Sequence, residues 1–293
     1  MKPPPFEYAA PGTVAEAVSL LRECEEDEAK ILAGGQSLMP LLNMRLARPE
    51  RLVDLGKLTE LDYIRETDGV LAIGAMTSKR SIERSPIVSS RQPLLHAATL
   101  FVGHPQIRNR GTVGGSMAQA DPAAEYPAVA LLLDAEMQVT GPAGDRSIRA
   151  DEFFVTYLTT ALEPAEVLTE VRLPALAAGT GWSFKEASRR HGDFAMAGAA
   201  VTLSVDGGGR CSEAKVVLFG VGATPLRARI AEEIVTGEQL EDRLFAHAGK
   251  KASEALEEPL SDIHAPEEFR RHLARVLTQR ALTEAAERAG GAA

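Results

Sequence analysis

Adjacent glycines constrain this chain more than any other feature of its sequence. The segment ILAGGQSLMP places Gly34 and Gly35 between a short apolar run and the polar pair Gln36–Ser37. A glycine inside regular structure costs about 0.5–1 kcal/mol relative to alanine. Two in a row therefore predict either a tight turn from a strand into a helix or a bare backbone that a ligand approaches.

A second segment, RNRGTVGGSMAQADPAAE, repeats the arrangement with Gly114 and Gly115 before Ser116. Successive exposed N–H groups in such loops form a concave nest for phosphate oxygens, and the missing Cβ atoms let a phosphate come close. Two loops of this kind can clamp the two phosphates of a dinucleotide. For either pair alone, the alternative of a simple turn or a close-packing site remains open.

Neither segment fits the better-known phosphate signatures, because no lysine follows the glycines as in a P-loop and no third glycine completes G-x-G-x-x-G. The segment VVLFGVGATP also contains Gly220 and Gly222 after an apparent strand, but Pro225 occupies the third position. Its surroundings are typical of antiparallel strands rather than a βαβ unit. We interpret this segment as a turn at the end of a strand, before a helix.

Charge, cysteine content and apolar run length exclude several classes of protein. The chain has 293 residues and a net charge of -9, which argues against a nucleic-acid surface. Cys24 and Cys211 lie far apart without metal-ligand spacing, so we expect no disulfide framework, no metal site and no iron–sulfur cluster held by this chain alone. The longest apolar run, AVALLL, is too short to span a bilayer, and prolines near the N-terminus replace the apolar region of a signal peptide. We expect a cytoplasmic protein without a transmembrane segment.

Hydrophobic periodicity and capping residues predict a mixed first half. Thr13 and Glu16 form a capping-box signature for a helix over 13–21, and Ser37 is placed to cap a helix through LMPLLNMRL. A glycine-broken loop is expected over 103–121. Strands are expected at 29–33, 51–55, 70–75, 136–150 (two) and 166–174, and helices near 77–84, 94–102 and 122–135.

The segment PALAAGTG, residues 174–181, is small and without periodicity, and it is our candidate domain boundary. Beyond it, GWSFKEA, FAMAGAAVTLSVD and RCSEAKVVLFG predict three strands. Three helices are expected to follow, over 226–235, 240–256 and 267–288. A few strands followed by several helices indicate a small α+β domain.

These segments together carry a resemblance. LAGGQSLMPLLNMRLARPERLVDL, IGAMT, HPQIRNRGTVGGSMAQADPAAEYPA and GVGATPLRA resemble the FAD-binding medium subunit of molybdenum hydroxylases, the carbon monoxide dehydrogenase and xanthine dehydrogenase flavoprotein family. The resemblance extends over nearly the whole chain. It implies an α+β fold with a two-lobed FAD-binding domain of the vanillyl-alcohol-oxidase (PCMH-like) type, followed by a small C-terminal domain with a three-stranded sheet and helices. The expected parts are residues 1–58, 59–176 and 180–288.

In that family the two glycine segments hold the FAD pyrophosphate from two sides. The first segment here shows a mild departure, Gln36 where relatives often have histidine, and the second has Val113 and Ser116 where isoleucine and asparagine are common. A polar contact to the ribose or the flavin edge is implied for Asp121. The implied cofactor-binding residues are Leu32, Ala33, Gly34, Gly35, Gln36, Ser37 and Leu38 in the first segment and Thr112, Val113, Gly114, Gly115 and Ser116 in the second.

The segment KEASRRHGDFAMAGAAV resembles the part of the family's C-terminal domain that reaches back to the flavin. The resemblance implies that Lys185 and Asp193 hydrogen-bond the cofactor or organise its pocket, and that Phe194 lies near the isoalloxazine ring. The alternative is a solvated charged strand end with a core phenylalanine. His104 and His191 have no metal-ligand partner at helical spacing, and no nucleophilic triad has a spacing that we recognise, so we expect no catalytic acid, base or nucleophile.

The resemblance implies a subunit that carries electrons. A large subunit would hold the molybdopterin cofactor, a small subunit would hold [2Fe-2S] clusters, and FAD in this chain would pass electrons to NAD or a quinone-type acceptor. Two alternatives remain. One is a free-standing FAD oxidoreductase of the same superfamily, and the other is a subunit without flavin that only bridges two partners.

Overall fold

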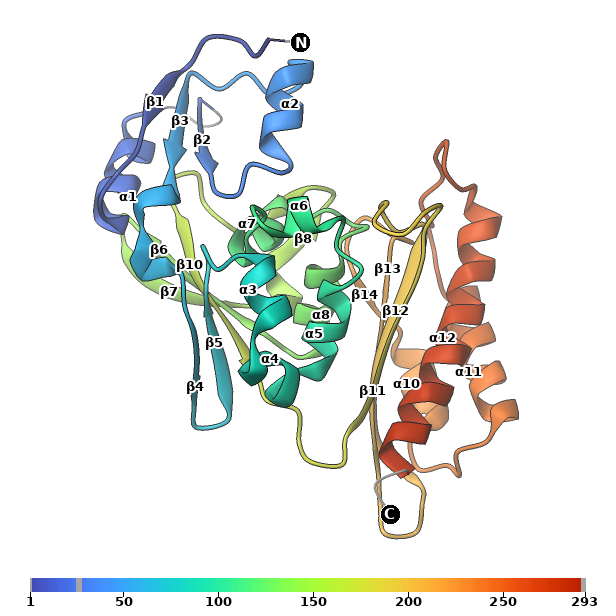
Figure 1. Cartoon of the computed structure of the whole chain (residues 1–293). Coiled ribbons are helices and arrows are strands. Elements are labelled where there is room, and N and C mark those ends of the chain that lie inside the picture. The colour runs from blue at the N-terminus through green and yellow to red at the C-terminus, as the bar shows by residue number, and fades with distance from the viewer. Residues whose placement is uncertain (1, 25–27, 291–293) are drawn as a thin grey trace.

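The computed structural model describes residues 2–24 and 28–290. Its first part is a small sheet with strand order β1-β3-β2, in which all neighbours run parallel (Figure 1). Its elements are β1 (Glu7–Ala9), α1 (Val14–Arg22), β2 (Ala29–Leu32), α2 (Leu38–Met44), β3 (Arg51–Asp54) and the 3-10 turns η1 (Leu55–Lys57) and η2 (Thr59–Leu61).

Helix α1 begins where the capping signature predicts. The Thr13 side chain accepts a hydrogen bond from the Glu16 backbone N–H at 3.1 Å. The Glu16 carboxylate accepts from the N–H of Gly12 at 2.7 Å. In a standard capping box it would accept from the N–H of Thr13, so this second hydrogen bond is shifted by one residue. The apolar face of the helix, with Ala17, Val18 and Leu21, is buried.

The second part is an antiparallel sheet with strand order β4-β5-β10-β6-β7 and helices packed on one face. The expected loop over 103–121 is wrong, because it contains α6 and α7. The elements are β4 (Ile64–Thr67), β5 (Val70–Gly74), α3 (Lys79–Arg84), α4 (Pro86–Arg91), α5 (Pro93–Thr99), α6 (Pro105–Arg108), α7 (Val113–Gln119), α8 (Glu125–Leu132), β6 (Glu136–Gly141), β7 (Gly144–Arg149), α9 (Ala150–Phe153), β8 (Phe154–Thr156), β9 (Thr159–Thr160) and β10 (Val167–Pro174).

The third part is an antiparallel sheet with strand order β11-β12-β13-β14. Its outer face is covered by α12 and α10, with α11 packed against both helices, and its inner face lies toward the second part (Figure 1). The elements are β11 (Gly181–Ala187), β12 (Ala197–Val205), β13 (Cys211–Phe219), β14 (Leu226–Arg227), α10 (Arg229–Val235), α11 (Asp242–Glu254) and α12 (Glu267–Gly290).

The expected three-stranded sheet therefore has a fourth, short strand. Leu226 and Arg227 pair with β13 instead of starting a helix, and α10 begins only at Arg229. The guanidinium of Arg227 holds Glu232 at 2.7 Å across this junction. The turn before β14 is structural: Gly220, at φ +70°, donates its N–H to the Pro122 carbonyl at 2.8 Å.

The second and third parts share one hydrophobic core. Phe184 of β11 packs between Phe101 and Phe219, with ring centroids 5.3 and 5.2 Å apart. All helices that the structure describes are too short or too polar to cross a membrane. Within the described residues, no group of three or more His, Cys, Asp or Glu side chains could hold a metal ion.

Candidate functional site

The first glycine motif, residues 32–38, connects the end of β2 to the start of α2. Gly35 has φ +73°, a conformation that L side chains rarely adopt. A Cβ on Gly34 would lie 2.2 Å from the carbonyl oxygen of Arg110, directly before the second motif. One glycine therefore makes the turn, and the other lets the two motifs touch.

The backbone of the first motif is open. Within the described chain, the N–H groups of Gly34, Gly35, Gln36 and Ser37 find no protein acceptor. The Ser37 side chain stands at the N-cap of α2 without making the capping hydrogen bond. Unsatisfied N–H groups at the start of a helix attract anions. The first motif thus has the donors that a phosphate needs.

The second motif, residues 112–116, is built differently. Thr112 caps α7 by accepting from the Gly115 N–H at 3.1 Å, and the Ser116 N–H reaches the Thr112 carbonyl at 3.2 Å. The Val113 and Gly114 N–H groups bond the carbonyls of Thr77 at 2.9 Å and Ala75 at 2.8 Å. The expected nest of free N–H groups at this motif is therefore wrong, because the fold has already used them.

The glycines of the second motif serve close contact. A Cβ on Gly114 would lie 2.5 Å from the Cβ of Ala75 in the second part. A Cβ on Gly115 would lie 3.5 Å from the Cβ of Ala33, so Gly115 faces the first motif. What the second motif offers a ligand is a bare surface and side-chain groups rather than N–H groups.

Lys79 is the side chain that completes the second motif, and the sequence reading did not find it. It starts α3, is almost fully buried, and donates from Nζ to the Ser116 Oγ at 3.2 Å. The ammonium also lies 5.2 Å from the centre of the Tyr126 ring. Burial lowers the pKa of Lys79, whereas the charge of Glu125 raises it. Lys79 provides a fixed positive charge beside the glycines.

Two carboxyl groups follow the second motif. The Asp121 carboxylate accepts from the Ala123 N–H at 2.9 Å, and burial raises its pKa. Glu125 begins α8 and is 8% exposed, and its carboxylate interacts with its own backbone N–H. Burial raises the pKa of Glu125 to about 7 even though the positive charge of Lys79 lowers it.

The structure separates the three residues expected from the C-terminal domain. Asp193 is exposed and Phe194 is 72% exposed, both in the connection between β11 and β12. This connection touches the stretch before the second motif, because a Cβ on Gly192 would lie 2.8 Å from His104 Cε1. Lys185 instead forms an ion pair with Glu284 of α12, on the opposite face of β11 from Phe184.

Glu186, the neighbour of Lys185, takes the side that faces the second part. Its Oε2 atom is enclosed and has no hydrogen-bond partner in the described part of the chain. Burial, together with a smaller effect from the charge of Glu125, raises the pKa of Glu186 to about 9. The free N–H groups of the first motif fit a phosphate group, and the orphaned carboxyl of Glu186 fits a polar group of an organic cofactor.

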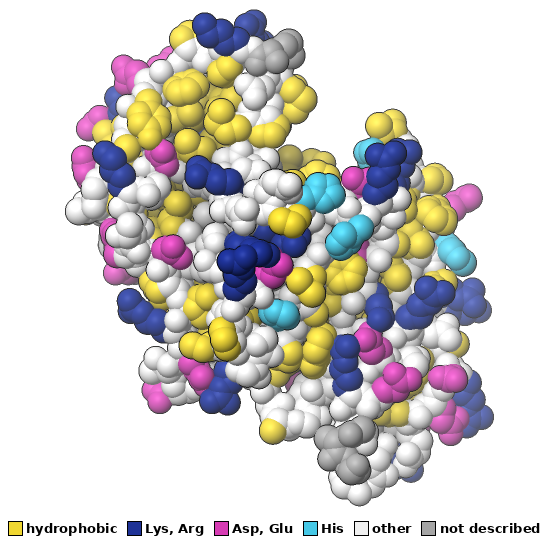
Figure 2. Space-filling model, viewed as in Figure 1, with side chains coloured by type: hydrophobic (Ala, Val, Ile, Leu, Met, Phe, Trp, Pro, Cys, Tyr) yellow, Lys and Arg dark blue, Asp and Glu magenta, His cyan; other side chains and the backbone are white. Residues whose placement is uncertain are grey.

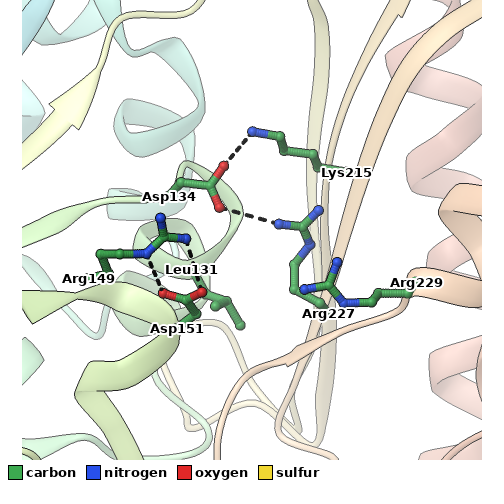
Figure 3. A pocket seen from close by; sticks show the side chains of 7 residues that line it. All are labelled: Leu131, Asp134, Arg149, Asp151, Lys215, Arg227 and Arg229. Atoms are coloured by element: carbon green, nitrogen blue, oxygen red, sulfur yellow. Dashed lines mark hydrogen bonds and ion pairs between the residues drawn. The ribbon is translucent and has the colours of Figure 1, made fainter.

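The surface is hollowed between parts of the molecule. Figure 2 shows a notch between the first part, at the upper left, and the C-terminal domain, at the right. A different hollow of about 330 Å³ lies where the end of α8 meets β13 and β14. Five of its charged groups form ion pairs with one another, Arg149 with Asp151 and Asp134 with both Lys215 and Arg227 (Figure 3). We interpret this second hollow as a clasp between domains.

Two protein families match consecutive parts of the chain. Residues 4–176 match the FAD binding domain in molybdopterin dehydrogenase, and residues 182–285 match the CO dehydrogenase flavoprotein C-terminal domain. The chain is 41% identical over 289 residues to the 6-hydroxypseudooxynicotine dehydrogenase complex subunit alpha of Paenarthrobacter nicotinovorans, covering 99% of this chain and 97% of the relative. It is 39% identical to the carbon monoxide dehydrogenase medium chain of Hydrogenophaga pseudoflava, covering 97% and 98%.

The fold also matches that of a solved structure. Carbon monoxide dehydrogenase from Hydrogenophaga pseudoflava, in a form lacking the Mo-pyranopterin moiety, superposes with a TM-score of 0.95 at 41% identity, covering 98% of this chain and 99% of that one. Fold and motifs thus define a two-lobed FAD-binding protein with a flavoprotein C-terminal domain. The chain belongs to the FAD-binding medium subunits of molybdenum hydroxylases, the carbon monoxide and xanthine dehydrogenase flavoprotein family.

Proposed function

We propose that this chain binds FAD between the first and second motifs and passes electrons from a small iron–sulfur subunit to NAD or a quinone-type acceptor. Its complex would include a large subunit with the molybdenum cofactor. The observation that carries this proposal is the run of unsatisfied N–H groups at Gly34 to Ser37, held against the second motif in a chain of this family.

Different residues of the chain would contribute different interactions with the cofactor. The free N–H groups of the first motif would hydrogen-bond the pyrophosphate oxygens, and Lys79 would offset part of their negative charge. The bare surface of Gly115 would let the cofactor pass between the motifs. Bound FAD supplies the conversion between one-electron and two-electron transfer, and the protein sets its position and electrostatics.

The C-terminal domain would close the site over the flavin. Phe194 is exposed beside the stretch that precedes the second motif, so its ring is free to cover an aromatic ligand. Asp193 lies next to it as a potential hydrogen-bond partner. Lys185 faces α12, so the contact proposed between Lys185 and the cofactor requires the ion pair with Glu284 to open and the lysine side chain to leave that face. The division of the chain into residues 1–58, 59–176 and 180–288 also stands as a proposal; each described sheet with three or more strands falls within one part.

The first experiment is an absorption spectrum of the purified chain, followed by acid release and identification of any flavin. Oxidised-flavin bands and released FAD are expected. A colourless chain that also fails to take up added FAD would favour the bridging subunit without flavin. Gly207→Ala, in the exposed turn between β12 and β13 with no atom within 4 Å of an added Cβ, is the control for cofactor that is lost during purification.

A second experiment addresses the partners and the acceptor. Purification from the native source is expected to bring down a larger subunit with molybdenum and a smaller one with [2Fe-2S] clusters. Reduced complex is then mixed with NAD or with a soluble quinone, and reoxidation of the flavin band identifies the acceptor. Substrate turnover by a clean monomer would support the free-standing oxidoreductase instead.

A further inference from the structure

Polar groups that are buried or half-buried form a row from the second motif into the C-terminal domain. Ser116 accepts from Lys79, Lys79 lies near enough to Glu125 for their charges to interact, and Glu125 in turn acts on Glu186. These groups come from α7, α3, α8 and β11, which the chain brings together only by folding. The row ends at the enclosed Oε2 atom of Glu186, which has no partner in the residues described.

Two carboxyl groups whose charges act on each other and that are shielded from water cannot both be ionised at low cost. The positive charge of Lys79 favours the ionised form of Glu125. Glu186 has no such partner, because no cation of the described chain is within ion-pair distance of its carboxyl group. The alternation along β11 excludes Lys185, which faces α12. Glu186 is therefore the member of the row that keeps its proton, and a protonated carboxyl is a hydrogen-bond donor.

We propose that Glu186 is a neutral hydrogen-bond donor that the C-terminal domain presents to the FAD held by the glycine motifs. The proposal rests on the proposed function. Glu186 is a binding and positioning residue, because it takes part in no bond-making step. The titratable groups that face it are Glu125 of α8, and beyond Glu125 the side chains of Asp121 and Lys79.

The proposal predicts a proton linkage in FAD binding. The pKa of Glu186 is raised to about 9 by burial, so the donor is present at neutral pH and lost at higher pH. Above that value the carboxylate is an anion that repels Glu125 and the phosphates, and the affinity for FAD falls. Glu186→Gln keeps a donor of similar shape that does not titrate, so its affinity should lack this fall.

The experiment is a titration of the purified full chain with FAD at several pH values, followed by flavin fluorescence. The ratio of the wild-type Kd to the Glu186→Gln Kd is expected to rise about tenfold from pH 8 to pH 10, as for one group titrating in this range. The ratio cancels contributions from Lys79 and from FAD itself. Glu213→Gln, an exposed carboxylate of the same sheet, is the matched control and should follow the wild type.

A pH-independent ratio would overturn the proposal for Glu186 while leaving FAD binding intact. Failure of both proteins to bind FAD at any pH would instead remove the proposed function. If Glu186→Gln does not fold, infrared spectroscopy of the wild-type chain with bound FAD decides. A protonated carboxylic-acid band that disappears only at alkaline pH supports the proposal, and its absence at neutral pH contradicts it.

Discussion

The first and second glycine motifs have nearly the same letters and opposite structures. Gly34 and Gly35 precede the seven-residue helix α2 by a few residues, and Gly114 and Gly115 lie in the first turn of the seven-residue helix α7. At the first motif the N–H groups from Gly34 to Ser37 have no acceptor in the described chain, whereas at the second the N–H groups from Val113 to Ser116 are all bonded. Paired glycines alone therefore do not identify a phosphate nest. A phosphate site also requires that their backbone N–H groups are not already hydrogen-bonded to the protein.

The largest expected effects come from filling the close contacts. Gly34→Val would drive a Cβ against the Arg110 carbonyl and Gly114→Val would drive one against Ala75. We expect each to lower the free energy of unfolding by about 3 kcal/mol or more, because backbone atoms must move. Denaturant unfolding followed by circular dichroism measures this. If Gly114→Val has normal stability but no longer binds FAD, Gly114 contacts the cofactor instead of serving only close packing.

Lys79→Met tests whether the second motif binds through side chains. Methionine fills a similar volume but removes the charge beside Ser116 and Glu125. We expect the affinity for FAD to fall by about 10- to 100-fold, since charge-assisted hydrogen bonds contribute about 1.5–3 kcal/mol. Flavin fluorescence titration measures it. Lys57→Met, at an exposed lysine, is the control, and equal affinities in the two variants would argue that Lys79 only supports the core.

Gly35→Ala sharpens the role of the first motif, because the left-handed conformation costs an L residue about 1–2 kcal/mol. We expect a modest loss of stability together with weaker FAD binding. Gly69→Ala is a matched control, since Gly69 has φ +77° and no atom within 4 Å of an added Cβ. It should lose similar stability and keep the affinity for FAD. Parallel losses of affinity in both variants would show that strain alone, and not the cofactor site, is measured.

The smallest predicted effect compares the two caps. Thr112→Ala removes a capping hydrogen bond and should lower the free energy of unfolding by about 1 kcal/mol. Ser37→Ala removes none, so the free energy of unfolding of the chain without cofactor should stay within about 0.5 kcal/mol of wild type. Urea unfolding of both variants tests this, and equal losses would remove the contrast between the motifs.

Local signals predicted local structure well. The capping residue Thr13 and the spacing of Ala17, Val18 and Leu21 placed α1, and the apolar runs placed β2, β3, β5 and β11 to β13 within a few residues. Helix α7 was missed because glycine is a poor helix former and its cap, Thr112, is the only local signal. Strand β14 was missed because two residues carry no periodicity and form a strand only by pairing with β13.

The amino-acid sequence alone determines the family, the order of the elements and the two glycine motifs, because these depend on local patterns and on residues in a recognisable order. Tertiary structure decides which N–H groups stay free, since the acceptors for Val113 and Gly114 come from residues 77 and 75. It also decides that Glu186 faces the second part while Lys185 faces α12. Successive side chains of a strand point to opposite faces, and only packing shows which face meets which neighbour.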